Sequence, residues 1–202
     1  MSDRHLHPAT GDASHDEIRL RHAKRELVAG QDGITIGGHE FPLHLVDRVV
    51  YRAATRINQA SYVIGLAQGA RTHTFAFTAY RKGTELEDAA VTWRRLVDLL
   101  ESTVCPRIAE SAVRTVSAGT TVTFGGPRSS RVDVSPEGVR PRRPFARTIP
   151  WARVTTADLA GGLARVWAAG ADGTPARKPA LCIDMTGWNA VVLPRVVRHF
   201  AA

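Results

Sequence analysis

Two histidines and a glutamate close together in the chain come nearest to a metal-binding motif. His39, Glu40 and His44 are the residue types of a zinc protease, in which a helix presents both imidazoles to the metal and the glutamate acts as base. That chemistry needs histidines four positions apart on a helix, whereas these lie five apart with Pro42 between them. The spacing predicts no metal site, and the rest of the sequence predicts neither a metal nor a cofactor.

Motifs for nucleophilic catalysis and phosphate loops are equally poorly supported. The chain has no Gly-x-Ser-x-Gly elbow, and Cys105 precedes a proline in an apolar helical stretch, where a thiol usually fills hydrophobic space. The glycine pairs at 37/38, 125/126 and 161/162 lie between expected strands, and no Gly-x-x-x-x-Gly-Lys run leads into a helix. We therefore expect turn glycines and a protein that is not an enzyme.

The strongest chemical signal is a group of arginines in the second half of the chain. Residues 1–119 carry 15 Lys or Arg and 14 Asp or Glu, whereas residues 120–202 carry 12 and 5. The basic excess is densest at Arg140, Arg142, Arg143 and Arg147. Such a group suits either a solvated hairpin or a site for an anionic protein, lipid or nucleic acid. These four arginines are the candidate anion-binding or partner-binding residues.

The positions of the aromatic residues argue against nucleic acid as the favoured partner. A platform for single strands interleaves aromatic and basic side chains on one surface. Trp93, Trp151 and Trp167 fall in expected helix or strand positions, where packing in the core is the usual role, and only Phe145 lies among the arginines.

One long amphipathic helix organises the elements that position these residues. Thr84 and Glu87 have the spacing of a capping box at its start, Pro106 predicts a kink or a restart, and Gly119 predicts its end. Apolar residues recur every three or four positions at Leu86, Ala89, Trp93, Leu96, Val97, Leu100, Val104, Ile108, Ala112 and Val116. The stripe predicts a helix whose apolar face covers another part of the protein.

Short strands are expected on both sides of this helix. They are predicted at residues 18–22, 26–29, 34–36, 43–51, 61–67, 72–79, 120–124 and 131–134, with a terminal helix at about 189–200. Matched residues recur at an offset of 105: Asp32 to Ile34 with Glu137 to Val139, Arg48 with Arg153, Tyr62 with Trp167, and Gly65 with Gly170. Phe75 and Phe77 match Leu181 and Ile183 at an offset of 106. This shared order predicts an internal duplication.

The expected fold is α+β, with two tandem pleckstrin-homology-like units. Each unit would be a small antiparallel sheet or open barrel closed by a C-terminal helix. We expect a disordered tail at 1–17, a first unit at 18–105, a connecting helix at 106–118 and a second unit at 119–202. The tail lacks the apolar segment of a secretory signal, and no apolar run is long enough to cross a bilayer.

The second half resembles an uncharacterised family of actinobacterial proteins. The resemblance is carried by Cys105 to Ala109, Ser117 to Gly125, Val134 to Gly138, Arg142 and Arg143, Thr148 to Trp151, and Gly187 to Asn189. These motifs are turns, a strand tryptophan and helix starts, so the resemblance implies no activity, ligand or catalytic residue. Members of that family often carry membrane-spanning segments, from which this chain departs.

The favoured function is a non-catalytic binding or scaffold module. Its expected location is the cytoplasm, because a chain with two cysteines and no disulfide framework fits a reducing compartment. Its partner would be a protein, a peptide or a second copy of the chain, bound at a strand edge or beside a terminal helix. The alternative is a peripheral module that binds anionic membrane surfaces through Arg140, Arg142, Arg143 and Arg147. An enzyme is the least favoured class.

Overall fold

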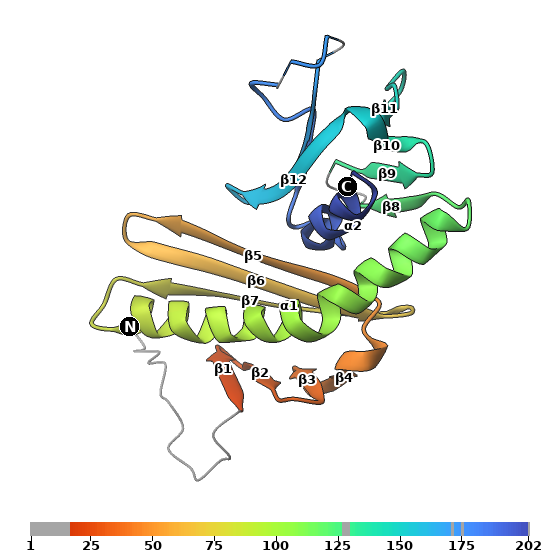
Figure 1. Ribbon diagram of the computed structural model, residues 1–202. Coiled ribbons are helices and arrows are strands. Elements are labelled where there is room, and N and C mark those ends of the chain that lie inside the picture. Colours follow the sequence, from red (N-terminus) through yellow and green to blue (C-terminus); the bar gives the residue numbers. More distant parts are fainter. Residues whose placement is uncertain (1–16, 127–129, 171, 175, 202) are drawn as a thin grey trace. The chain divides into compact units, whose positions relative to one another are not determined.

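The chain forms two compact units, with the boundary between Val104 and Cys105. The computed structural model describes residues 17–126, 130–170, 172–174 and 176–201 (Figure 1). The tail expected at residues 1–17 therefore lies, except for residue 17, outside the described residues. Each unit contains two small antiparallel sheets and helical structure, so the expected α+β class is confirmed. No helix among the described residues is long and apolar enough to cross a membrane.

The first unit begins with a four-stranded sheet in sequence order. Its strands are β1 (Ile18–His22), β2 (Arg25–Ala29), β3 (Gly33–Ile36) and β4 (His39–Pro42). Gly37 and Gly38 both have positive φ, at 56° and 83°, which glycine adopts without a Cβ clash and which lets β3 turn sharply into β4. The tight turn expected at this glycine pair is confirmed.

A second sheet of three strands completes the first unit. Its strands are β5 (Arg48–Arg56), β6 (Gln59–Gln68) and β7 (Arg71–Tyr80), in that order. The single strand expected over residues 43–51 is wrong, because Leu43–Leu45 form a 3-10 helix, η1, and β5 starts at Arg48. Pro42, with φ at −57° and no N–H to pair, ends β4 and starts η1. Leu43 and Val46 become buried as a result.

One helix, α1 (Glu85–Ser117), follows β7 and continues past the unit boundary. Of the kink or restart expected at Pro106, the restart is wrong, because α1 continues without a break from Pro106 to Ser117. The kink stays a prediction. Val104, Cys105, Ile108 and Ala109 are buried around the proline. Burying each large apolar side chain contributes about 1.5–3 kcal/mol. Together these contributions exceed the roughly 3 kcal/mol by which an internal proline disfavours a helix.

Within the first unit, the apolar stripe of α1 packs on the sheet formed by β5, β6 and β7. The Trp93 ring lies 5.1 Å from that of Tyr62 and 6.5 Å from that of Phe77, measured between centroids. Figure 1 shows the first part of α1 running along β5, β6 and β7. At the start of the helix, the Thr84 hydroxyl donates to Asp88 Oδ2 at 2.7 Å instead of forming the expected pair with Glu87.

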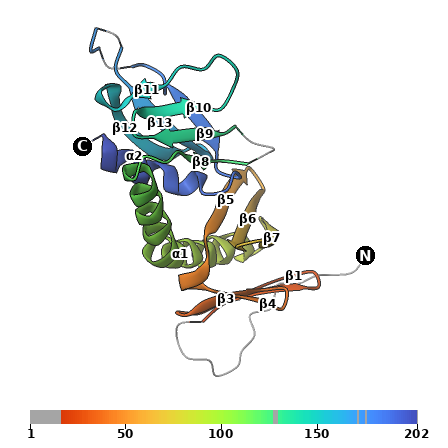
Figure 2. The ribbon, with the colours of Figure 1, turned by 90° about the vertical axis from the view of Figure 1, so that its right-hand side faces the viewer.

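The second unit also has a four-stranded sheet followed by a three-stranded one. The first comprises β8 (Val122–Phe124), β9 (Val132–Ser135), β10 (Gly138–Pro141) and β11 (Ile149–Pro150). After the 3-10 helix η2 (Trp151–Arg153) come β12 (Val154–Ala160), β13 (Leu163–Ala168) and β14 (Leu181–Asp184). The chain ends with η3 (Ala190–Val192) and α2 (Leu193–Phe200). Helix α2 packs against β12 and β13 (Figure 2).

The same order of elements therefore occurs twice: four strands, a 3-10 helix, three strands and a helix. Pro42 precedes η1 and Pro150 precedes η2. The matched arginines also have equivalent roles. Arg48 Nη2 donates to the carbonyl of Gly69, just after β6, and Arg153 Nη2 donates to the carbonyl of Ala169, just after β13. Each guanidinium group thus forms a hydrogen bond between the start of one strand and the end of its neighbour.

The predicted matches in the middle strands are out of register. The buried positions of β6 include Ala60 and Tyr62, and those of β13 include Ala164 and Val166, an offset of 104. Trp167 points to the opposite face from Val166 and so does not match Tyr62. A single-residue shift of this kind exchanges the two faces of a strand.

Candidate anion-binding loop

The loop between β10 and β11 carries three of the four candidate arginines. Backbone hydrogen bonds hold its base, from Arg142 N to Arg131 O at 2.8 Å and from Arg143 N to Pro141 O at 2.9 Å. Ala146 N donates to Arg143 O at 3.3 Å, which turns the chain back. Phe145, within this turn, has a left-handed backbone with φ at 59°. The tip of the loop is therefore a defined turn.

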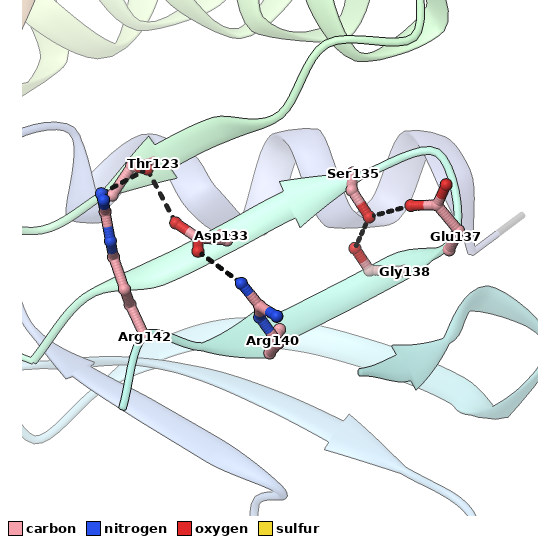
Figure 3. Close-up of polar contacts among 7 residues, drawn as sticks. All are labelled: Thr123, Asp133, Ser135, Glu137, Gly138, Arg140 and Arg142. Carbon is pink, nitrogen blue, oxygen red and sulfur yellow. Dashed lines mark hydrogen bonds and ion pairs between the residues drawn. The ribbon is translucent and has the colours of Figure 1, made fainter. Parts of the chain in front are cut away.

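Arg140 and Arg142 each have a side-chain partner on a neighbouring strand (Figure 3). Arg140 Nη2 lies 3.5 Å from Asp133 Oδ2, and Arg142 Nη1 donates to Thr123 Oγ1 at 3.3 Å. The Thr123 hydroxyl in turn donates to Asp133 Oδ1 at 2.7 Å. These contacts follow from strand register, because Asp133 on β9 is paired with Thr123 on β8 and with Arg140 on β10. One carboxylate thus connects three strands.

Asp133 makes Arg140 a structural residue. The carboxylate is only 8% exposed, and a buried charge is unfavourable unless hydrogen bonds and an opposite charge compensate it. Arg140 supplies the opposite charge, so part of its attraction for an external anion is already cancelled. Arg142 remains exposed, and its guanidinium makes a long contact, of 3.3 Å, with the Thr123 hydroxyl.

Arg143 and Arg147 are exposed, and neither guanidinium has a hydrogen-bond or ion-pair partner within the described part of the chain. Between them, the Phe145 side chain is fully exposed. Residues 138–157 contain five arginines and no aspartate or glutamate, so the surroundings of the loop in sequence are uniformly basic. We call Arg142, Arg143, Phe145 and Arg147 the arginine–phenylalanine loop. It can offer an anionic surface both charge and an apolar side chain.

The sequence located the four arginines but treated them as equivalent. It did not identify Asp133 or Thr123 as their partners, because the register of β8, β9 and β10 is needed to bring these residues together. An aspartate between two valines in the apolar run of β9 was the only available signal.

The histidines considered for metal binding lie apart. His39 is on β4 and stacks on His73 of β7, with 3.9 Å between the ring centroids, while His44 is exposed in η1. Among the described residues, no three His, Cys, Asp or Glu side chains are grouped to hold a metal ion. Cys105 is fully buried in α1. The described residues therefore give no support for a metal site at His39 and His44.

Known proteins add no assignment to this geometry: no family model matches the chain, and a search of curated proteins finds no relative.

Proposed function

We propose that the protein is a non-catalytic binding module built from two tandem pleckstrin-homology-like units. The repeated order of four strands, a 3-10 helix, three strands and a helix supports this proposal. So does the equivalent use of Arg48 and Arg153 to fasten neighbouring strands. A duplicated unit needs only one exposed loop to diverge in order to acquire a binding site.

The module binds an anionic membrane surface through the arginine–phenylalanine loop. The observation that carries this proposal is the fully exposed Phe145 between arginines at the turn of the loop. Each basic side chain near an anionic leaflet contributes about 1 kcal/mol, and burying a phenylalanine adds roughly 1.5–3 kcal/mol. Three arginines and one aromatic ring would therefore give weak, reversible and salt-sensitive binding, of the kind expected for a peripheral protein.

Cosedimentation with vesicles tests the proposal. Vesicles of phosphatidylcholine alone are compared with vesicles that also contain phosphatidylserine, at about 0.1 M and about 0.5 M salt, because surface attraction is strongly screened at the higher concentration. Binding only to the phosphatidylserine vesicles, and only at low salt, is the expected result. The double variant Arg143→Glu, Arg147→Glu should abolish it. Equal binding to both vesicle types, or unchanged binding of this variant, would overturn the proposal.

A protein or peptide partner is the second candidate, favoured by one edge of the sheet formed by β5, β6 and β7. Within the described residues, β7 pairs with β6 alone, so no strand is added at its outer edge. An extended segment, including one from a second copy, could add there as a further strand. Self-association of this kind predicts that amide exchange in β7 slows as protein concentration rises. Constant exchange together with a monomeric mass would exclude it.

A further inference from the structure

Two stacked histidines in the first unit lie near two arginines. His39 at the start of β4 and His73 on β7 have ring centroids 3.9 Å apart and an interplanar angle of 28°. The edge of the buried Phe41 ring lies against His73, with 5.7 Å between centroids, which limits how the imidazole can turn. The pair thus joins the two sheets of this unit.

Two arginines also act on the histidine pair. Arg25, at the start of β2, donates from Nη2 to the carbonyl of Thr74 at 2.8 Å, which places its guanidinium beside β7. Arg71, at the start of β7, is exposed. Desolvation is the main cause that lowers the pKa of His73, and repulsion from His39, Arg25 and Arg71 lowers it further. Every charged group that shifts the pKa of His73 is therefore basic.

We propose that His39, His73, Arg25 and Arg71 form a binding site for a doubly charged phosphate-type anion. Guanidinium groups bind such oxyanions with paired hydrogen bonds, and protonated imidazoles add further donors. The site lies in the first unit and does not depend on the arginine–phenylalanine loop, so it goes beyond the function proposed above.

Binding at this site is coupled to proton uptake. Stacked imidazoles repel each other when both are charged, so the empty site holds His73 neutral near pH 7. A bound dianion offsets this repulsion and favours the protonated form of His73. Affinity for the anion therefore rises as the pH falls from about 7.5 to about 5.5, the range over which histidine titrates.

Sulfate is the first probe, because it remains a dianion throughout this range. Proton NMR of the histidine rings in the full chain follows each titration midpoint, with sodium chloride at matched ionic strength as the control. We expect sulfate to raise the midpoint of His73 by about one pH unit, as a nearby opposite charge does. The exposed His44 should move equally little in both salts. Equal movement of His73 in sulfate and chloride would overturn the proposal.

A matched pair of variants tests the composition of the site. Arg71→Gln and Arg56→Gln remove the same charge from exposed residues on the outer strands of one sheet, and the register places them at opposite ends. We expect Arg71→Gln to weaken sulfate binding at least about tenfold, as befits hydrogen bonds to a charged group, and Arg56→Gln to leave it unchanged. Equal effects of the two variants would mean that sulfate responds only to the overall positive charge, and would contradict a specific site at Arg71.

Two further measurements identify the source of the phosphate group. Glycerol phosphate in solution is compared with vesicles containing phosphatidic acid, both in the Arg143→Glu, Arg147→Glu background so that the loop does not contribute. Saturable binding of glycerol phosphate assigns a free phosphate ester, whereas binding to the vesicles alone assigns a lipid headgroup. Failure of both probes overturns the proposal without affecting the proposal for the loop, whose test uses phosphatidylserine.

Discussion

Asp133 lies directly opposite Arg140 in the register of β9 and β10, and 3.5 Å separates Asp133 Oδ2 from Arg140 Nη2. The carboxylate is buried while the arginine side chain is 52% exposed, so this ion pair is only partly shielded from solvent. Loss of the Arg140 guanidinium should destabilise the fold, because the largely buried Asp133 carboxylate would lose its opposite charge. Of its two described side-chain partners, Asp133 would keep the Thr123 hydroxyl.

We expect Arg140→Gln to lower the free energy of unfolding by about 1 kcal/mol, discounted for the exposure of the arginine. Arg143→Gln, which removes the same charge from the loop, should leave it unchanged. Urea denaturation of both variants measures the difference. For vesicle binding, by contrast, Arg143→Gln should have a larger effect than Arg140→Gln. If both variants unfold at the same urea concentration as the unaltered chain, Asp133 does not depend on Arg140.

Phe145→Asn separates the apolar part of membrane binding from the electrostatic part. Asparagine tolerates the left-handed backbone at this turn, so the fold should be retained. Loss of the buried ring should weaken binding to phosphatidylserine vesicles about tenfold or more, since about 1.4 kcal/mol corresponds to that factor. The salt dependence should stay the same, because no charge is removed. A flattened salt dependence with unchanged affinity would contradict insertion of the ring.

Pro106→Ala restores a backbone N–H inside an unbroken helix. We expect the variant to be more stable by about 1–3 kcal/mol, up to the full difference in helix propensity between alanine and proline. Circular dichroism during urea denaturation provides the measurement. A matched change, Ser111→Ala, lies on an exposed position of the same helix and should change stability by less than about 0.7 kcal/mol. A less stable Pro106→Ala protein would show that packing of the proline ring outweighs the missing hydrogen bond.

Asp158 should contribute to acid unfolding through its contacts on β12 and β13. Its pKa is lowered, first by hydrogen bonds from Arg165 at 2.6 Å and 3.0 Å and also by one from Trp167. A lowered pKa means that the stabilisation is present above the ordinary aspartate range, near 4, and is lost as pH falls through the folded value. Asp158→Asn should therefore reduce the pH dependence of stability below about pH 4. An unchanged pH profile of urea midpoints would contradict this role.

Local patterns were sufficient where neighbouring residues decide the structure. The alternation around Phe75 and Phe77 and the stripe from Ala89 to Val116 predicted a strand and a helix that the structure confirms. Leu43 was assigned to a strand because its apolar neighbours outweighed Pro42, which in fact ends β4 and starts η1. Pro106 was expected to cause a kink or a restart, and the helix does not restart there; the burial around the proline could not be read from local propensity.

The candidate sites depend on contacts that are distant in sequence. Four basic side chains could be found in a run around Arg143, but the contact between Asp133 and Arg140 required the register of two strands. His39 and His73 carry no local signal, since they belong to different sheets and meet only when those sheets pack. The single-residue shift between Tyr62 and Val166 likewise depends on where each hairpin turns.

The boundary between the two units lies inside α1, between Val104 and Cys105. Domain boundaries usually fall in exposed linkers that can be cut without damage. Division here would create two new helix ends, each with about four backbone groups deprived of their partners. It would also split the stripe that runs from Ala89 to Val116. A cut at this boundary would therefore leave each half with an incomplete helix.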